Sequence, residues 1–212
     1  MRILNLYAGI GGNRKLWEGH EVTAVEYKPE IAAIYQSHFP TDTVIVADAH
    51  AYLLEHYREF DFIWSSPPCP SHSKALQPNS AAHPDKQKPL YPDMRLYEEI
   101  VFLKHYFAGK WCVENVISYY EPLIPPMRFG GHYFWTNFPM PPYGISGNTD
   151  REHDGTLQAL NDRKGFNLKS GEQKNTRLLL RNCVEPELGK HILDWAQKEY
   201  HHTQPLFPID NP

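Results

Sequence analysis

Five short apolar runs, each followed by a more polar segment, constrain the fold of this chain more than any other feature. They lie at 3–6, 22–25, 44–46, 62–65 and 111–113. Runs of this length, bounded by polar residues, are typical of strands that are buried on both faces of a sheet. Their alternation with longer segments predicts a doubly wound, mostly parallel α/β sheet of the Rossmann-like kind.

Two of the longer segments outside these runs have the periodicity of a helix with one buried face. The segment 92–107 begins with a proline, which is favoured in the first turn of a helix, and carries apolar residues at helical spacing. These are Leu96, Ile100, Leu103 and Phe107. A second helix is predicted to begin at Pro186 and to turn four residues inward, namely Leu188, Ile192, Trp195 and Tyr200.

Length and composition indicate one folded domain over 1–212. The chain has 212 residues, of which 41% are hydrophobic and 22% charged, enough for one buried core. Residues 201–212 contain three prolines and are predicted to form an extended tail. The three cysteines are far apart in sequence, and we find no signal peptide or membrane-length apolar run, so we expect a cytoplasmic protein without a disulfide framework.

Charge gives no global reason to expect nucleic acid as a partner, because the net charge is −4. The segment 151–181 is the local exception, with seven Lys and Arg against four Asp and Glu. Two interpretations stay open for it, a basic patch that binds nucleic acid and a solvated loop.

Polar and glycine residues follow directly after each predicted strand. In a parallel sheet the carboxyl ends of the strands meet at one edge, where ligands bind. The residues at this edge are Tyr7-Ala8-Gly9-Ile10-Gly11-Gly12, Glu26-Tyr27, Asp48-Ala49, Pro67-Pro68-Cys69 and Glu114-Asn115. The sequence therefore predicts one site that combines a glycine turn, three acidic groups and a thiol.

The glycine turn and the first two acids predict a nucleoside cofactor. A carboxylate at Glu26 can accept hydrogen bonds from ribose hydroxyls, Asp48 can accept one from an adenine amino group, and the glycines let the backbone approach the ligand. Gly12 and Glu26 are fourteen positions apart, fewer than the roughly twenty of dinucleotide folds. A cofactor without a pyrophosphate fits this spacing better, although such a turn also occurs in ordinary loops.

Five segments resemble, in order, the successive motifs of the DNA cytosine carbon-5 methyltransferases: "LNLYAGIGG", "VEY", "VADAH", "SSPPCPSHS" and "CVENV". A sixth, "LLRNCVEPELGKHIL", is similar to the family's late cofactor motif. The resemblance implies S-adenosylmethionine as cofactor, with Asn182 and Val184 completing its site. It also implies DNA as substrate, a flipped cytosine and a covalent bond between enzyme and base.

The chemistry of such a reaction requires the residue types at the strand ends. Carbon 5 of cytosine is a poor nucleophile until a thiolate adds to carbon 6, and Cys69 is the candidate thiol. We expect it to be partly accessible, with a stabilised thiolate. Glu114 is the candidate acid toward ring nitrogen 3, with a raised pKa. Pro67 and Pro68 restrict the backbone before the thiol.

Other interpretations of these residues remain open. An isolated cysteine is often a small buried hydrophobe, Cys69 with His72 forms half of a zinc-like spacing, and Glu114 could pair with a lysine. No second pair of ligands follows, so we predict no metal. Cys112 and Cys183 are predicted to be packing residues.

The chain departs from the family pattern after the glutamate motif. The family carries an Arg-x-Arg element there and then a long recognition region, whereas this chain has only Arg128 and the short stretch 117–180. We interpret Arg128 as a base- or phosphate-binding residue, with a salt bridge as the alternative. Such a short region predicts an enzyme that reads few base pairs, acts on single-stranded or distorted DNA, forms a homodimer, or uses DNA contacts of a partner protein.

Three smaller features have two interpretations each. Residues 133–135 are aromatic and are predicted to be core rather than a stacking platform for a base. The loop 72–91 is a candidate lid over the base. Arg181 stands where the family has glycine, and a cation there would suit an acidic variant of the cofactor.

Three functions from different classes remain. The leading one is a compact cytosine carbon-5 methyltransferase, indicated by Cys69 after Pro68 together with Glu114. The second is a methyltransferase for amino groups of cytosine or adenine, which also uses a Ser-Pro-Pro corner but needs no thiol. The third is a non-catalytic module that binds nucleic acid or cofactor.

Overall fold

The computed structural model describes residues 1–73, 91–143, 156–169 and 176–199. Seven strands form one sheet: β1 (Arg2–Leu6), β2 (Glu21–Glu26), β3 (Thr43–Val46), β4 (Phe62–Ser65), β5 (Lys110–Val116), β6 (Met127–Phe129) and β7 (His132–Thr136). The helices are α1 (Pro29–His38), α2 (Ala49–His56), α3 (Arg95–Tyr106), α4 (Leu157–Lys164), α5 (Thr176–Arg181) and α6 (Pro186–Ala196), with a 3₁₀ turn at Tyr57–Glu59.

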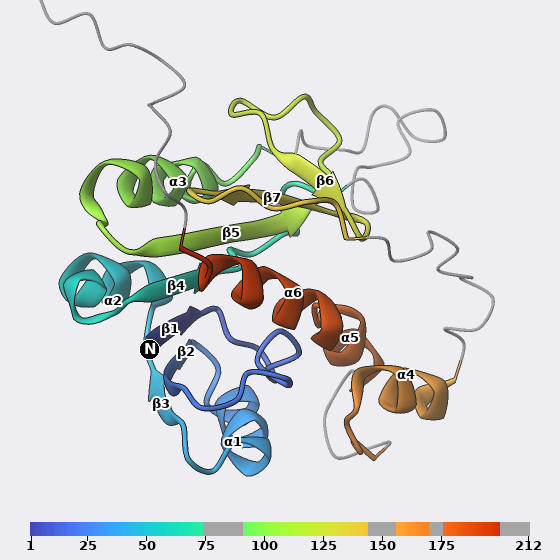
Figure 1. Ribbon diagram of the computed structural model, residues 1–212. Coiled ribbons are helices and arrows are strands. Elements are labelled where there is room, and N and C mark those ends of the chain that lie inside the picture. Colours follow the sequence, from blue (N-terminus) through green and yellow to red (C-terminus); the bar gives the residue numbers. More distant parts are fainter. Residues whose placement is uncertain (74–90, 144–155, 170–175, 200–212) are drawn as a thin grey trace, which may run out of the picture.

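The order of the strands in the sheet is β3-β2-β1-β4-β5-β7-β6 (Figure 1). Five of these strands are parallel, while β7 runs antiparallel to β5 and pairs with β6 in a hairpin. The order reverses direction between β1 and β4, which is the position where doubly wound folds bind ligands. The predicted Rossmann-like, mostly parallel α/β fold is confirmed.

Helices cover both faces of the sheet (Figure 1). On one face, α6 packs Leu188 and Ile192 against Ile3 and Phe62 of the sheet. On the other face, α2 and α3 pack against the alternate residues of the same strands, including Leu4. Successive side chains of a strand point to opposite faces, so a strand between two helical layers is predominantly apolar. This requirement accounts for the apolar runs in the sequence, in which Asn5, Thr23 and Ser65 are the polar exceptions.

The predicted helices form with small shifts at their ends. The segment predicted from Pro92 becomes helical at Arg95, and Leu96, Ile100 and Leu103 are buried as expected. Pro186 begins α6 as predicted. Tyr200, the predicted tail 201–212 and most of the candidate lid lie outside the described residues.

Phe134 and Trp135 lie in the core on β7, as predicted, while Tyr133 is half-buried. Gly130 and Gly131 connect β6 to β7, with φ angles of 57° and 78°. Two residues in this left-handed region form the tight turn that matches the twist of a hairpin. The turn therefore fixes the register of β6 beside β7.

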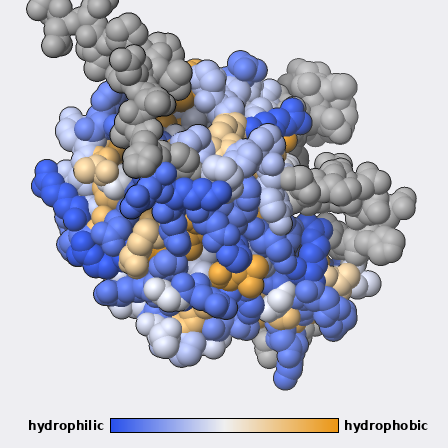
Figure 2. All heavy atoms as spheres, in the orientation of Figure 1, coloured by the Kyte–Doolittle hydropathy of each residue, from blue (hydrophilic) through white to orange (hydrophobic). Residues whose placement is uncertain are grey.

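On the face of the molecule seen in Figure 2, hydrophilic side chains cover most of the surface and apolar ones form small separate patches. Such scattered patches are normal for a folded domain in water. Among the described helices, none combines the length and the apolar character that crossing a bilayer requires.

Candidate functional site

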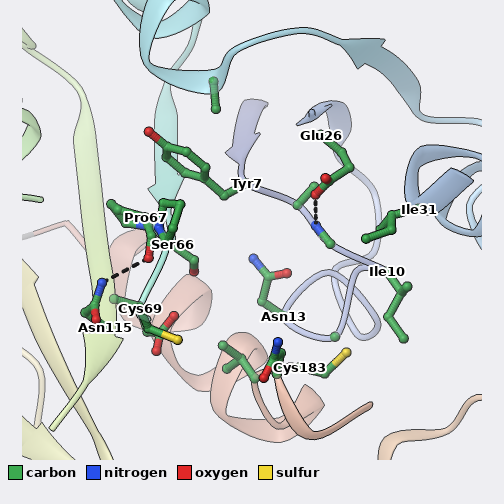
Figure 3. A pocket seen from close by; sticks show the side chains of 18 of the residues that line it. Tyr7, Ile10, Asn13, Glu26, Ile31, Ser66, Pro67, Cys69, Asn115 and Cys183 are labelled. Carbon is green, nitrogen blue, oxygen red and sulfur yellow. Dashed lines mark hydrogen bonds between the residues drawn. The ribbon is translucent and has the colours of Figure 1, made fainter. Parts of the chain in front are cut away.

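A pocket of about 570 Å³ opens at the carboxyl ends of the parallel strands (Figure 3). This volume is in the range of cofactor and small-ligand sites. Fourteen of the sixteen predicted site residues line it, all except Gly11 and Arg128. Cys69, Pro67 and Asn115 lie on one side of the pocket in Figure 3, and Glu26 and Ile31 lie on the other.

The turn after β1 forms the floor of the pocket. The backbone N–H of Gly9 donates to Glu26 Oε2 over 3.0 Å, and Lys28 N–H donates to the other oxygen over 2.9 Å. These bonds hold the carboxylate at the mouth of the turn while each oxygen keeps further acceptor capacity. Gly9 has a φ of 55°, and a Cβ there would meet no atom within 4 Å, so its side is open to a ligand.

Asp48 and Ala49 line the pocket where α2 begins. The Asp48 carboxylate caps the helix by accepting from Ala51 N–H over 3.0 Å, and its second oxygen lies 3.5 Å from the Arg95 guanidinium. Tyr27 also lines the pocket, with 71% of its surface exposed. An exposed aromatic ring in a pocket is suited to packing against a flat heterocycle.

The segment that joins α5 to α6 closes the pocket, with Asn182 exposed and Val184 buried. It packs directly on the glycine turn, because a Cβ at Gly12 would lie 2.6 Å from the Val184 carbonyl oxygen. Gly11 faces the other way: its φ is 86°, and a Cβ there would lie 2.3 Å from the Phe39 ring. Gly11 is thus a packing position and does not line the pocket.

Cys69 is held on a stiff corner after β4. Asn115 Nδ2 donates to the Pro67 carbonyl over 3.0 Å, and the N–H groups of His72 and Ser73 both donate to the Cys69 carbonyl over 3.0 Å. The corner is therefore bonded on both sides of the thiol. Cys69 itself is half-buried and lines the pocket. Cys112 and Cys183 are buried among core residues, as predicted, although Cys183 also lines the pocket.

Burial raises the pKa of the Cys69 thiol, and the nearby Glu114 carboxylate raises it further, against a smaller lowering by a backbone hydrogen bond. The expectation of a stabilised thiolate is therefore wrong for the protein without a ligand. The expectation that Cys69 is partly accessible agrees with its half-buried position in the wall of the pocket. Glu114 is 7% exposed and lines the same pocket.

Arg128 lies apart from the pocket for a reason that the strand register makes clear. Arg128 pairs with Tyr133, whereas Glu114 pairs with Phe134 on the neighbouring position of β7. Adjacent positions of a strand point to opposite faces, so Arg128 and Glu114 are on opposite faces of the sheet. Arg128 is exposed.

Among the residues that the sequence did not single out, Asn13 and His132 line the pocket. Asn13 is 6% exposed, and its amide donates to the Asn5 side chain over 2.8 Å. His132 begins β7, with its Nδ1 3.6 Å from Glu114 Oε1. The Gly-Gly pair before His132 is the sequence signal that marks this position.

A buried carboxylate joins the elements around the pocket. Glu99 of α3 has no exposed surface, and it accepts hydrogen bonds from Tyr7 Oη and Ser65 Oγ, both at 2.5 Å. Its oxygen also lies 3.1 Å from His50 Nδ1 of α2. The hydrogen bond to Glu99 raises the pKa of His50 despite its burial, and burial with the Glu99 charge raises the pKa of the Tyr7 phenol far above its usual value.

Part of the basic stretch 151–181 has a structural role. Lys164 is 4% exposed, and its Nζ donates to the Cys183 carbonyl over 2.6 Å and to Glu185 over 2.7 Å. Arg163 pairs with the same carboxylate. These two cations therefore hold α4 against the start of α6. In the described part of the chain, no three His, Cys, Asp or Glu residues form a group that could hold a metal ion.

The fold and the site define a class: a Rossmann-like domain whose pocket combines a glycine turn and a carboxylate with a thiol and a second carboxylate. The family of C-5 cytosine-specific DNA methylases matches residues 1–107, and the chain belongs to it. The match includes the glycine turn, Glu26, Asp48 and Cys69, and ends before Glu114. Membership supports a DNA methyltransferase that depends on S-adenosylmethionine. No curated protein matches the chain.

Solved structures resemble parts of the chain at low identity. A DNMT2 mutant of Spodoptera frugiperda is 22% identical, with a TM-score of 0.37, over 54% of this chain and 35% of that one. A putative DNA modification methyltransferase encoded within a prophage of E. coli is 19% identical, with a TM-score of 0.38, over 57% and 33%. A conserved hypothetical protein of Streptococcus pyogenes is 15% identical, with a TM-score of 0.43, over 64% and 85%.

Proposed function

We propose that this protein transfers a methyl group from S-adenosylmethionine to carbon 5 of cytosine in DNA, through a transient bond between Cys69 and carbon 6 of the base. One observation carries the proposal: a single pocket of a DNA methylase family member is lined by Cys69, by Glu114, whose charge acts on the Cys69 thiol, and by Glu26, which lies across the pocket from Cys69 in Figure 3. The pocket thus has separate places for a base and a nucleoside.

The residues on the nucleoside side fit S-adenosylmethionine. Glu26 offers carboxylate lone pairs to the ribose hydroxyls, Asp48 offers one to the adenine amino group, and Tyr27 offers a ring face. The open side of Gly9 leaves room for the cofactor beside the backbone. Bound here, the cofactor supplies an electrophilic methyl group on a sulfonium. The segment with Asn182 and Val184 covers the remaining side.

On the other side, Cys69 and Glu114 act on the base. The Cys69 thiol loses its proton to solvent and its sulfur forms a bond to carbon 6, while Glu114 gives a proton to nitrogen 3 as the ring loses its aromaticity. Carbon 5 is then an enamine-type nucleophile that accepts the methyl group. Loss of the carbon 5 proton and departure of the thiolate restore the ring, and the Glu114 proton is regained from nitrogen 3. Pro68 limits the freedom that Cys69 loses on alignment.

The raised pKa of the Cys69 thiol fits a nucleophile that becomes reactive only when the site is filled. The Glu114 carboxylate contributes to raising it, and protonation of Glu114 removes that contribution. A positive charge bound in the pocket lowers a thiol pKa. We infer that thiolate formation is coupled to binding, which protects the free thiol from oxidation.

DNA recognition rests on less of this chain than is usual for a base-flipping enzyme, and Arg128 is exposed on the opposite sheet face from Glu114. We propose Arg128 as a phosphate-binding residue. The stretch 117–180 supplies the hairpin of β6 and β7 together with α4 and most of α5. We propose that a second copy or a partner protein supplies further DNA contacts.

The test is nucleoside analysis of plasmid DNA after incubation with purified protein and labelled S-adenosylmethionine. We expect label only in 5-methylcytosine, and none above background with Cys69→Ser. Label in N4-methylcytosine or N6-methyladenine would instead assign an amino-group methyltransferase. Cofactor binding without any labelled nucleoside, on single- or double-stranded DNA, would indicate a binding module.

A further inference from the structure

His132 is fixed beside Glu114 by the hairpin of β6 and β7. The Gly130-Gly131 turn places His132 opposite Val116, two positions along β5 from Glu114. Positions two apart on a strand, and residues paired across strands, share a face of the sheet. His132 and Glu114 therefore project from the same face, and both line the pocket that contains Cys69.

The contact between the two side chains has one unusual property. Nδ1 of His132 lies 3.6 Å from Glu114 Oε1, is inaccessible to solvent, and has no hydrogen-bond partner. A buried polar nitrogen without a partner costs free energy, about 1–3 kcal/mol. The side chain as a whole is 27% exposed and that of Glu114 is 10% exposed, so the pair lies at the wall of the pocket rather than in the core.

In its proposed role, Glu114 must carry its proton on one particular carboxyl oxygen, and the residue alone cannot fix which one. A protonated carboxyl has one O–H donor and one acceptor oxygen, and cytosine presents an acceptor at nitrogen 3 beside a donor at its amino group. The carboxyl complements the base only when its proton is on the correct oxygen. With the two oxygens equivalent, half of the protonated molecules would present the wrong arrangement.

We propose that His132 is a positioning residue for Glu114, and that its Nδ1–H donates to one carboxyl oxygen and so leaves the carboxyl proton on the other. This inference rests on the proposed function. Nδ1 is the ring nitrogen that faces Glu114, 3.6 Å from Oε1, so the tautomer with a proton on Nδ1 is the one that can donate to this carboxyl. Closing the 3.6 Å gap needs a shift of less than an ångström, which binding of a base can supply.

The consequence is selectivity as well as rate. Uracil presents a donor at its nitrogen 3 and an acceptor at carbon 4, the reverse of cytosine. A carboxyl with a fixed proton pairs with cytosine and meets uracil with two mismatched contacts. A closed site that is built to hydrogen-bond its substrate rejects an analogue that leaves polar groups unpaired, by about 10⁴-fold.

The test compares three substitutions of His132 in the full chain. An asparagine places its amide N–H where Nδ1 stands, a glutamine carries it one bond further, and a phenylalanine keeps a ring without any donor. The readout is the single-turnover rate at which DNA containing 5-fluorocytosine forms a denaturant-stable adduct, together with KM for S-adenosylmethionine. His105→Phe, at an exposed position of α3, is the matched control.

We expect His132→Phe and His132→Gln to slow adduct formation about 10- to 100-fold, a part of the effect of a full acid–base residue. We expect His132→Asn to stay within about threefold of the wild type, with KM for the cofactor unchanged in all three. Equal rates for the asparagine and glutamine variants, or a wild-type rate for phenylalanine, would overturn the inference. Absence of any adduct with the wild type would overturn the proposed function, and this inference with it.

Discussion

The buried carboxylate of Glu99 offers the sharpest prediction about what holds the pocket together. Its two oxygens accept from Tyr7 and Ser65, and His50 lies against one of them. Glu99→Leu fills similar space but removes every acceptor, so both hydroxyls lose their partners. At about 1–3 kcal/mol for each unsatisfied buried group, the expected loss of unfolding free energy is about 4 kcal/mol.

The matched control is Glu98→Leu, because Glu98 is the next residue of the same helix and its side chain is 62% exposed. Surface substitutions of this kind change stability by about 0.5 kcal/mol or less. Thermal unfolding followed by circular dichroism should place the midpoint of Glu99→Leu about 8–16 °C below that of Glu98→Leu, since a chain of this length shifts about 2–4 °C per kcal/mol.

The reasoning also predicts a functional consequence, because Tyr7 lines the pocket and Ser65 precedes the corner that holds Cys69. At a temperature below its unfolding midpoint, Glu99→Leu should bind S-adenosylmethionine more weakly than Glu98→Leu, as measured by titration calorimetry. Equal midpoints for the two variants would refute the view that Glu99 joins the elements of the site. Glu99→Gln, which keeps one acceptor, should fall between the two.

Three further predictions follow from single contacts. Glu114→Gln removes a charge that raises the pKa of Cys69. Iodoacetamide should therefore alkylate Cys69 faster at pH 7, while the rate of methyl transfer falls at least about 100-fold. Slower alkylation would contradict the influence of Glu114 on the thiol. Gly12→Ala places a Cβ 2.6 Å from the Val184 carbonyl oxygen, so the segment between α5 and α6 must shift. Calorimetry should then report an affinity for S-adenosylmethionine at least about tenfold weaker. An unchanged affinity would show that this segment does not contribute to cofactor binding. Burial alone would raise the pKa of Glu185, but its bonds to Arg163 and Lys164 outweigh burial and lower the pKa. The ionised carboxylate therefore stabilises the fold fully above about pH 4.3, and this stabilisation is lost as the pH falls through the lower folded pKa. The free energies of urea unfolding of the wild type and of Glu185→Gln should converge in acid, and a difference that stays constant with pH would argue against the ion pairs.

The sheet could be predicted because burial on both faces imposes a pattern that survives in each strand separately. The short apolar runs gave five strands, and the residues after them fell at one edge, since parallel strands must end together. Twelve of the fourteen predicted site residues that line the pocket do so for that reason, while Asn182 and Val184 come from the segment between α5 and α6. The hairpin of β6 and β7 was not predicted, because its strands are short and one is on the sheet edge.

The differences between expectation and structure have equally physical causes. The interpretation of Arg128 follows the family's Arg-x-Arg element, whereas the face of the sheet on which Arg128 lies is decided by the two-glycine turn, which is a recognised hairpin signal. Reading "RFGGH" as a hairpin would have placed Arg128 and His132 on opposite faces. Glu99 occupies the apolar face of its helix, three residues after Leu96, and a charge at such a position indicates a buried network. The pKa of Cys69 depends on a residue 45 positions away and needs coordinates.

The covalent bond between Cys69 and the base is the central claim, and intact mass spectrometry tests it most directly. The protein, S-adenosylmethionine and an oligonucleotide with 5-fluorocytosine should give a species with the summed mass of protein, oligonucleotide and one methyl group, less the hydrogen that the Cys69 thiol loses. Peptide mapping should place the oligonucleotide on Cys69. Methylation of ordinary DNA without any such species, or an adduct at Cys112 or Cys183, would contradict the account.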